Sequence, residues 1–514
     1  MLTQQGTVVP EAASADPEDR PAPASRRRIP AFLTEPWFLP LLLAAVLGLW
    51  RCTSIVLWWD ELSTLDIARR PVAGIFATAQ HVDAVHSLYY LLMHFWMKLF
   101  GSSVLAVRLP SVLAMCGSTV CTAALARRLF DRRVAITASF IFALIPGVDR
   151  YASETRSYAL VVLGSALALL ALFRALERPT TRRWVLYAAL IAFTGALNLV
   201  ALIALSTHLV VVLVSRPSGR RRALKAFGLA AAAAIAVLTP VIVYGILEAG
   251  AQLNHLPRAS YSSLPSIWEQ AGCSGVFSLI VLLAIPLLLE HRRRTSAIAV
   301  LSAAVLPVLL LWIVSVNSMG FSYFSRYLLF VLPAWAIAVA AAVDRFKGVP
   351  AVAFVAVVLA TALAVTHDQI VLHGTLSHFE FDYPGPSTSA EDYPAAAAVI
   401  EANYRPGDAA SFAVAPHLQL GIDYYLPGDE QLRDVFEQRT TAQTESLLPE
   451  NCTNMVACIE KAPDRVWLVE SGDVLSSSTE QVDRAFILDY LYQRVQIWQV
   501  SGITLTLLER AAPR

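Results

Sequence analysis

The chain has 514 residues, of which 56% are hydrophobic and only 15% are charged, and its formal net charge at pH 7 is +1. A soluble domain usually carries about 25% charged residues, so this composition excludes an ordinary soluble protein. The small net charge leaves no basic surplus for neutralising nucleic-acid phosphates, so we expect no nucleic-acid partner.

The first 35 residues differ from the rest because they are rich in Pro, Ala, Ser and charged residues and end in a basic cluster, Arg26–Arg28. This composition predicts a disordered cytoplasmic tail. The segment has no short apolar core followed by a cleavage site, so we do not expect it to be a secretory signal peptide.

Long apolar runs dominate residues 36–366, and runs of about 18 or more apolar residues are typical of membrane spans. We predict about eleven spans, near 37–57, 104–126, 134–150, 157–174, 184–197, 199–215, 226–247, 273–290, 296–316, 327–343 and 349–366. Clusters of Arg and Lys at alternate loops should face the cytoplasm. We therefore expect a multi-pass protein of the cell membrane with a cytoplasmic N-terminus and an extracytoplasmic C-terminus.

One apolar stretch, 88–100, is too short to be a span, since a helical span needs about 20 residues. We interpret it as a juxtamembrane helix within the first extracytoplasmic loop, 58–103. If it crossed the membrane, every later arginine cluster would move to the outer side.

The first span ends in "VLWWDELSTLD", where two tryptophans are followed by Asp60 and Glu61. Acids at the end of a span are costly, which makes them functional candidates. The alternative is structural, with Asp60 as the N-cap of a short helix and Glu61 in its first turn.

The same loop contains "HVDAVHSLYYLLMHFWMKLFG", with candidate residues Asp83, His86 and Tyr89. Three histidines, at 81, 86 and 94, could suggest zinc, but no two of them have the i, i+4 spacing that places histidines on one helix face. We favour polar contacts to a ligand headgroup over a metal site.

Further charged residues gather in other predicted outer loops. Glu154 and Arg156 lie in "DRYASETRSYAL", and Arg326 lies in "FSYFSRYLL". Interfacial ion pairs and snorkelling arginines are the structural alternatives. The loop 248–272, with His255 and Trp268, resembles an amphipathic lid. A transporter would normally place polar groups near the midplane. The predicted spans carry few ionisable residues at mid-depth, His208 being one candidate, so we expect interfacial chemistry on an amphipathic substrate.

Charges, Pro and Gly return after residue 366, and 367–514 predicts an extracytoplasmic α/β domain. We expect a helix, a turn at Gly407-Asp408 and a strand, with further strands in "DRVWLVES" and "ITLTLLER". Cys452 and Cys458 are either a disulfide, which an outer compartment permits, or two free thiols.

The ordered set of the acidic pair, "HVDAVHSLYYLLMHFWMKLFG", "RLPSVLA" and "ASETRSYAL" resembles the GT-C membrane glycosyltransferases over about residues 35–370. It is most similar to the protein-mannosyltransferase and aminoarabinose-transferase superfamily, in its actinobacterial branch. Many members have "PPLYY" where this chain has "VHSLYY", so the loop geometry and the acceptor can differ.

The resemblance implies an all-α GT-C module that takes a sugar from a polyprenyl-phosphate donor at the outer leaflet of the lipid bilayer. It implies Asp60 as the catalytic base of an inverting transfer. Arg326, and next Arg156, would stabilise the leaving phosphate, while Glu61 and Asp83 would orient the sugar or the acceptor.

Several assignments stay open. Glu154 and Tyr89 are further donor-site candidates, and His86, His255 and Trp268 are candidates for the acceptor site or lid. Some members use a divalent metal ion and others do not. The donor sugar would be mannose or a pentose such as arabinose, and the acceptor a cell-envelope glycan, lipid or protein. The alternatives are a transporter or flippase of lipid-linked sugars and a non-catalytic membrane scaffold.

Overall fold

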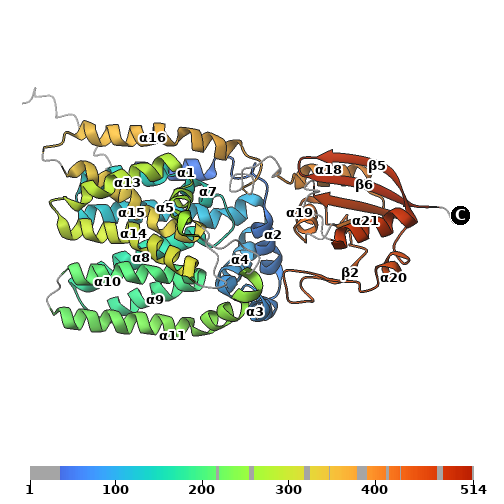
Figure 1. Cartoon of the computed structure of the whole chain (residues 1–514), viewed down its shortest axis with the longest axis horizontal. Coiled ribbons are helices and arrows are strands. Elements are labelled where there is room, and N and C mark those ends of the chain that lie inside the picture. The colour runs from blue at the N-terminus through green and yellow to red at the C-terminus, as the bar shows by residue number, and fades with distance from the viewer. Residues whose placement is uncertain are drawn as a thin grey trace, which may run out of the picture. The chain divides into compact units, whose positions relative to one another are not determined.

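The computed structural model describes residues 35–215, 219–253, 260–317, 325–345, 348–378, 390–412, 416–428, 430–471 and 479–511. Its first part is helical (Figure 1). The long or apolar helices are α1 (Phe38–Leu49), α5 (Val104–Leu129), α6 (Arg132–Leu144), α8 (Tyr158–Glu177), α9 (Thr181–Leu197), α10 (Ala204–Val214), α11 (Arg220–Leu253), α13 (Gly275–Leu289), α14 (Arg294–Asn317), α15 (Leu332–Asp344) and α16 (Ala351–Gly374).

Shorter helices connect them. These are α2 (Trp59–Arg69), α3 (Val72–His81), α4 (Ser87–Phe100), α7 (Pro146–Ala152) and α12 (Leu264–Gly272), with 3₁₀ turns η3 (Ala84–His86), η4 (Leu199–Ile203), η5 (Tyr261–Ser263) and η6 (Ser325–Val331). Each of the eleven predicted apolar segments contains a helix, but the first, 37–57, is helical only over α1, which ends at Leu49, ten residues before α2 begins at Trp59. By length and composition, six described helices could cross a membrane, or eight if each of two bent pairs is one span. The total of eleven crossings stays a prediction.

Two bends have local causes. α6 and α7 meet at 60°, because Ile145 precedes Pro146 and is therefore extended rather than helical. The η5–α12 segment and α13 meet at 107°, where Cys273 is left-handed and Ser274 caps α13 by accepting from the amide of Phe277. The two bends touch: a Cβ on Gly147 would lie 3.2 Å from the carbonyl oxygen of Gly272, so this close approach favours glycine.

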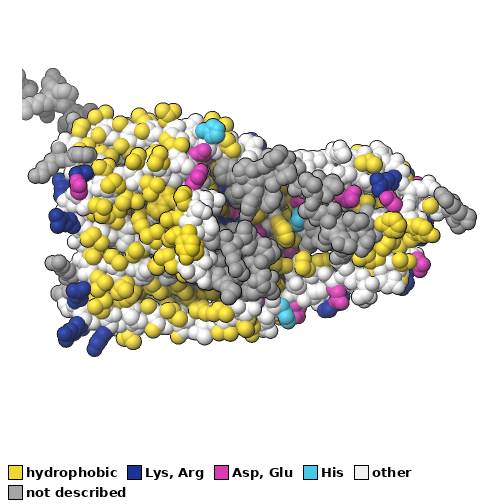
Figure 2. Space-filling model, in the orientation of Figure 1, with side chains coloured by type: hydrophobic (Ala, Val, Ile, Leu, Met, Phe, Trp, Pro, Cys, Tyr) yellow, Lys and Arg dark blue, Asp and Glu magenta, His cyan; other side chains and the backbone are white. Residues whose placement is uncertain are grey.

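The arginine-bearing loops meet at one end of the helical module, and Figure 2 shows Lys and Arg side chains gathered there, on the left. Arg292 pairs with Asp344 at 3.1 Å, and Arg133 donates to the Val349 carbonyl at 3.2 Å. Helix α2, which contains Asp60, lies at the opposite end (Figure 1). This common location of the arginines agrees with an even number of crossings between successive clusters.

Helix α4 agrees with the juxtamembrane interpretation of 88–100. Its 14 residues span about 21 Å, which is shorter than a hydrocarbon core of about 30 Å. It packs against α2 and α3, and α5 begins only four residues after α4 ends, at Val104.

The C-terminal part has mixed α/β structure. Its elements are α18 (Tyr393–Asn403), β1 (Ala409–Phe412), α19 (Pro416–Tyr425), β2 (Glu437–Arg439), β3 (Glu450–Asn451), α20 (Met455–Ile459), β4 (Arg465–Ser471), α21 (Thr479–Leu491), β5 (Tyr492–Val500) and β6 (Ile503–Arg510). The main sheet has the order β1-β4-β6-β5, in which β1 and β4 are parallel and the other pairs antiparallel. The predicted helix and strands are present, and Cys452 and Cys458 are joined by a disulfide.

The boundary between the two parts is less sharp than expected from the sequence. Helix α16 continues to Gly374, beyond the expected end of the last span at residue 366, and residues 36–514 form one compact unit. The sheet-bearing part contacts α2 directly. Thr441 donates to the Asp66 carboxylate at 3.1 Å, and the ring of Trp59 stacks on His417 with centroids 4.8 Å apart.

Candidate active site

The first turn of α2 separates the two neighbouring acids. The helix begins at Trp59 and its N-cap is Trp58, whose backbone N–H donates to Glu61 Oε2 at 3.4 Å. The expectation that Asp60 is the cap was therefore wrong: Glu61, three residues after the cap, satisfies the backbone donor. The Asp60 carboxylate takes no part in this cap and faces Arg156 and Arg326 instead.

Glu61 forms a fully buried ion pair. Its two oxygens accept from Arg108 Nε at 2.9 Å and Nη2 at 2.6 Å, and Oε1 also accepts from the amide of Thr155 at 2.8 Å. The remaining Arg108 donors reach backbone carbonyls, Cys52 among them at 2.6 Å. The pair ties α2 to α5 and to the segment between α7 and α8, so Glu61 positions these elements rather than contacting a substrate.

Asp60 instead faces two cations. Its Oδ2 lies 3.4 Å from Arg326 Nη1 and 3.8 Å from Arg156 Nε. The Asp60 side chain is 25% exposed, whereas Arg156 is 7% exposed and Arg326 is 13% exposed. Three segments far apart in the sequence thus bring one acid and two arginines together at the end of the module opposite the arginine clusters.

The charge state of Asp60 follows from these neighbours. Burial by itself would raise its pKa, but the attraction of Arg156 and then Arg326 outweighs burial, so the pKa of Asp60 lies below its usual value. The amino-terminal end of α2 also favours a negative charge there. Asp60 is therefore an anion at neutral pH, as a general base must be.

His86 and Thr64 hold Arg156 in place beside Asp60. Arg156 Nη2 donates to His86 Nε2 at 3.1 Å, and Nη1 donates to Thr64 at 3.3 Å. Arginine can only donate, so His86 accepts at Nε2 and carries its proton on Nδ1. Burial, and next Arg156, lower the pKa of His86 to about 4, so the imidazole is neutral.

Aromatic rings surround Arg326. Its guanidinium lies 5.5 Å from the ring centre of Trp58 and 5.7 Å from that of Tyr158. Trp58 is itself fixed, because its indole N–H donates to Glu154 at 3.0 Å. Glu154 also pairs with Arg150 at 2.9 Å. Glu154 thus supports one wall of the site rather than projecting freely into it.

Several buried polar atoms near this centre have no hydrogen-bond partner within the described part of the chain. They are Tyr89 Oη, Tyr158 Oη, His86 Nδ1, Thr155 Oγ1 and Ser157 Oγ. Buried polar groups are normally paired, and groups left without partners are expected where a ligand completes the site. Hydroxyl and N–H groups of this kind suit a ligand with several hydroxyls, such as a sugar.

Asp83 occupies a neighbouring turn. Its backbone is left-handed, with φ of 63°, and its carboxylate accepts from the hydroxyl of Tyr90. The following amide, that of Ala84, donates to Glu248 at 3.0 Å. Asp83 therefore shapes the loop that presents His86.

Two expected members of a lid have different outcomes. Trp268 is buried, not exposed on a lid: it stacks on Trp335 with ring centres 4.6 Å apart and donates to the Ser278 carbonyl at 3.2 Å. The broken α12–α13 turn folds this part of the loop into the bundle. His255 lies outside the described residues.

The three histidines considered for zinc have separate partners. His81 lies near Glu445 at the surface, His86 bonds Arg156, and the buried His94 is 2.8 Å from the Ala68 carbonyl. Within the described ranges, no three His, Cys, Asp or Glu side chains lie close enough to hold a metal ion.

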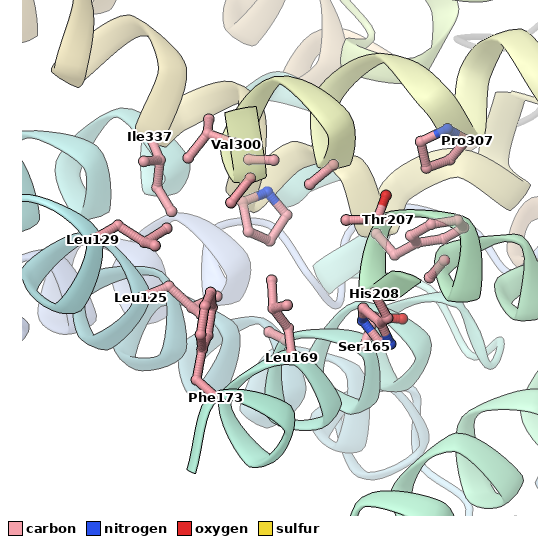
Figure 3. A pocket seen from close by; sticks show the side chains of 17 residues that line it. Leu125, Leu129, Ser165, Leu169, Phe173, Thr207, His208, Val300, Pro307 and Ile337 are labelled. Carbon is pink, nitrogen blue, oxygen red and sulfur yellow. The ribbon is translucent and has the colours of Figure 1, made fainter. Parts of the chain in front are cut away.

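A small cavity lies among α5, α8, α10, α14 and α15, and Figure 3 shows its mainly apolar walls with His208, Thr207 and Ser165 on one side. It holds about 50 Å³, whereas ligand pockets usually measure about 300–1,000 Å³. His208 lies 2.9 Å from the Tyr187 hydroxyl. This cavity is too small for a lipid-linked sugar and does not support a midplane transport site.

The sequence-based list of site residues omits Arg108 and Tyr158. Arg108 opens the quoted "RLPSVLA" stretch, and an arginine just inside an apolar segment signals a buried partner. Tyr158 belongs to "ASETRSYAL", but a single tyrosine at the start of a span is common at interfaces and carries little signal.

The fold is that of the GT-C membrane glycosyltransferases. Residues 87–244 match the family model described as dolichyl-phosphate-mannose-protein mannosyltransferase. No curated protein matches the chain. The structure is similar to that of ArnT from Cupriavidus metallidurans, with a TM-score of 0.59 and 15% identity over 93% of this chain and 99% of ArnT.

Two larger proteins share the fold. Arabinofuranosyltransferase AftD from Mycobacteria matches with a TM-score of 0.54 and 14% identity, over 93% of this chain and 40% of AftD. The Archaeoglobus fulgidus oligosaccharyltransferase matches with a TM-score of 0.51 and 11% identity, over 89% of this chain and 72% of that protein. The actinobacterial branch stays a prediction.

Proposed function

We propose that this chain is an inverting glycosyltransferase that moves a sugar from a polyprenyl-phosphate donor to a hydroxyl of a cell-envelope glycan, lipid or protein. The observation that carries the proposal is the Asp60 carboxylate within 4 Å of both Arg156 and Arg326, beside buried hydroxyls without partners. The fold adds support, and ArnT has been solved with bound undecaprenyl phosphate.

In this mechanism Asp60 takes the proton of the acceptor hydroxyl while the acceptor oxygen forms a bond to the anomeric carbon of the donor sugar. The bond from that carbon to the phosphate oxygen breaks on the opposite face, and its electron pair leaves with the phosphate. The phosphodiester carries one negative charge and the departing lipid phosphate carries two. No general acid is needed, but the growing charge requires stabilisation.

Arg326 and Arg156 can supply that stabilisation, since guanidinium groups bind phosphate through paired hydrogen bonds. Their attraction also explains how a carboxylate of low pKa becomes a better base. As the arginines turn toward the phosphate, their attraction for the Asp60 carboxylate weakens, and the pKa of Asp60 rises. Glu61 and Glu154 position this machinery by holding Arg108 and Trp58.

We further propose that the Asp60 end faces the extracytoplasmic side and the arginine end faces the cytoplasm, as the positive-inside rule predicts. In this orientation the donor sugar is presented at the outer leaflet. We propose mannose or a pentose such as arabinose as that sugar. The sheet-bearing C-terminal part, which contacts α2 through Thr441 and His417, is placed to bind the acceptor.

A transfer assay with purified protein and a panel of polyprenyl-phosphate mannose and pentose donors tests this proposal. The expected result is donor-dependent release of polyprenyl phosphate together with a glycosylated acceptor. Movement of intact lipid-linked sugar between leaflets of a vesicle, with no release of lipid phosphate, would instead indicate a flippase. Absence of both activities would favour a scaffold.

A further inference from the structure

A groove open to the surface runs along α11 at the arginine end, on the side formed by α8, α9 and α11, and it is independent of the Asp60 site. Its volume is about 790 Å³, within the usual range for ligand sites. Small side chains on α11, Ala223, Ala226, Ala230 and Ala233, form its floor, and Trp184 and Val185 of α9 form its wall. Figure 2 shows apolar atoms along α11 with basic side chains at its left end.

The length of the groove matches one leaflet. It extends along α11 from Arg222 to Ala233, which at 1.5 Å per residue is about 16 Å. Half of a hydrocarbon core of about 30 Å is about 15 Å. A groove that begins at the headgroup level and ends near the midplane fits an acyl chain of the adjacent leaflet.

The mouth of the groove is strongly positive. Arg222 lines it, and the segments that flank the mouth carry six further cations, Arg178, Arg182, Arg183, Arg220, Arg221 and Lys225, against one acid, Glu177. That acid is already paired with Arg128. Arg182, Arg220, Arg221 and Arg222 are exposed. Trp184 lies in the first turn of α9, and tryptophans prefer the membrane interface.

We propose that this groove binds an anionic glycerophospholipid, with an acyl chain between α9 and α11 and the phosphate against Arg222 and Arg182. Apolar atoms of the groove shield the chain, and the cationic mouth selects the headgroup, as basic pockets between membrane helices do for anionic lipids. Most of the apolar part of α11 between Arg220 and Glu248 is not buried by other helices. The bound lipid would fasten this helix to α8 and α9.

Native mass spectrometry and thermal unfolding of the full-length protein, in neutral detergent with added phosphatidylglycerol or phosphatidylcholine, test the proposal. The expected result is preferential retention of phosphatidylglycerol and a higher unfolding temperature with that lipid only. The double variant Arg182→Gln/Arg222→Gln should bind phosphatidylglycerol about 25-fold more weakly, at about fivefold for each arginine near the surface.

Arg294→Gln removes an exposed arginine at the same end but outside the groove and should leave binding unchanged. Ala226→Leu narrows the groove without touching the charges and should also weaken retention. Equal retention of both lipids by wild type, or unchanged retention in the double variant and in Ala226→Leu, would overturn the proposal. Inorganic phosphate and polyprenyl phosphate are added in parallel samples. The proposal is also overturned if inorganic phosphate alone reproduces the thermal shift, or if polyprenyl phosphate binds and phosphatidylglycerol does not.

Discussion

Arg326 Nη1 and Asp60 Oδ2 lie 3.4 Å apart, although they are far apart in the sequence. Asp60 lies in α2, after the first apolar helix, and Arg326 lies in η6, directly before α15. Arg326 is also enclosed by the rings of Trp58 and Tyr158. A guanidinium held this way is available to a phosphate that displaces it from Asp60, which links donor binding to the strength of the base.

The first prediction concerns Arg326. Arg326→Gln should raise the KM for the lipid-phosphate donor by about ten- to a hundredfold, because a charge-assisted hydrogen bond is worth about 1.5–3 kcal/mol. Arg326→Lys should give an intermediate value, since lysine keeps the charge but not the paired geometry. Steady-state kinetics measure both, and an unchanged KM in Arg326→Gln would exclude phosphate contact.

The second prediction concerns the buried pair of Glu61 and Arg108, both 0% exposed in their side chains. Removing one partner leaves an uncompensated charge, so Glu61→Gln or Arg108→Met should each destabilise the fold by about 3–5 kcal/mol. The double variant should recover part of that loss. Unfolding temperatures of the three variants measure the effect. Single variants as stable as wild type would contradict the structural role.

The third prediction is a pH dependence from His86. Its pKa is about 4 in the folded protein and about 6.5 when unfolded, so the unfolded state binds more protons between these values. The contribution of His86 is fully present above about pH 6.5 and falls as pH decreases to about 4, by about 3 kcal/mol.

His86→Gln should flatten this part of the stability profile while it keeps an acceptor for Arg156. Burial also lowers the pKa of His378, so some acid dependence should persist in the variant. Thermal unfolding between pH 4 and pH 7 measures the difference. A variant profile that parallels wild type would show that His86 is not the titrating group.

The fourth prediction concerns topology. In a Cys273→Ser background, a cysteine at Gln80 on α3, before α4, and one at Lys98, near the end of α4, should both react with an impermeant thiol reagent in intact cells. A cysteine at Arg182 should react only after permeabilisation, because it lies at the arginine end. Protection of the cysteine at residue 80 or 98, or labelling at residue 182 before permeabilisation, would contradict the proposed orientation.

The sequence predicted most of the helical architecture because membrane spans leave long apolar runs. It also predicted the strands at 464–471 and 503–510, whose β-branched and apolar residues form β4 and β6. The bend between α12 and α13 was harder to predict, since it depends on a left-handed Cys273 and a close contact at Gly147. That bend is the reason Trp268 is buried.

At the site, Asp60, Arg156 and Arg326 could be proposed from their loops and from the family resemblance. The division of work between Asp60 and Glu61 could not, because adjacent acids look equivalent in sequence. Only the helix start at Trp59 and the position of Arg108 make Glu61 the buried partner and leave Asp60 exposed to ligand.

The most direct test of the central claim is the transfer rate of Asp60→Asn with donor and acceptor at saturation. The variant keeps the size of the side chain and removes the base, so the rate should fall by about 10²–10⁴-fold, with donor binding and folding retained. Undiminished transfer by Asp60→Asn would contradict the account.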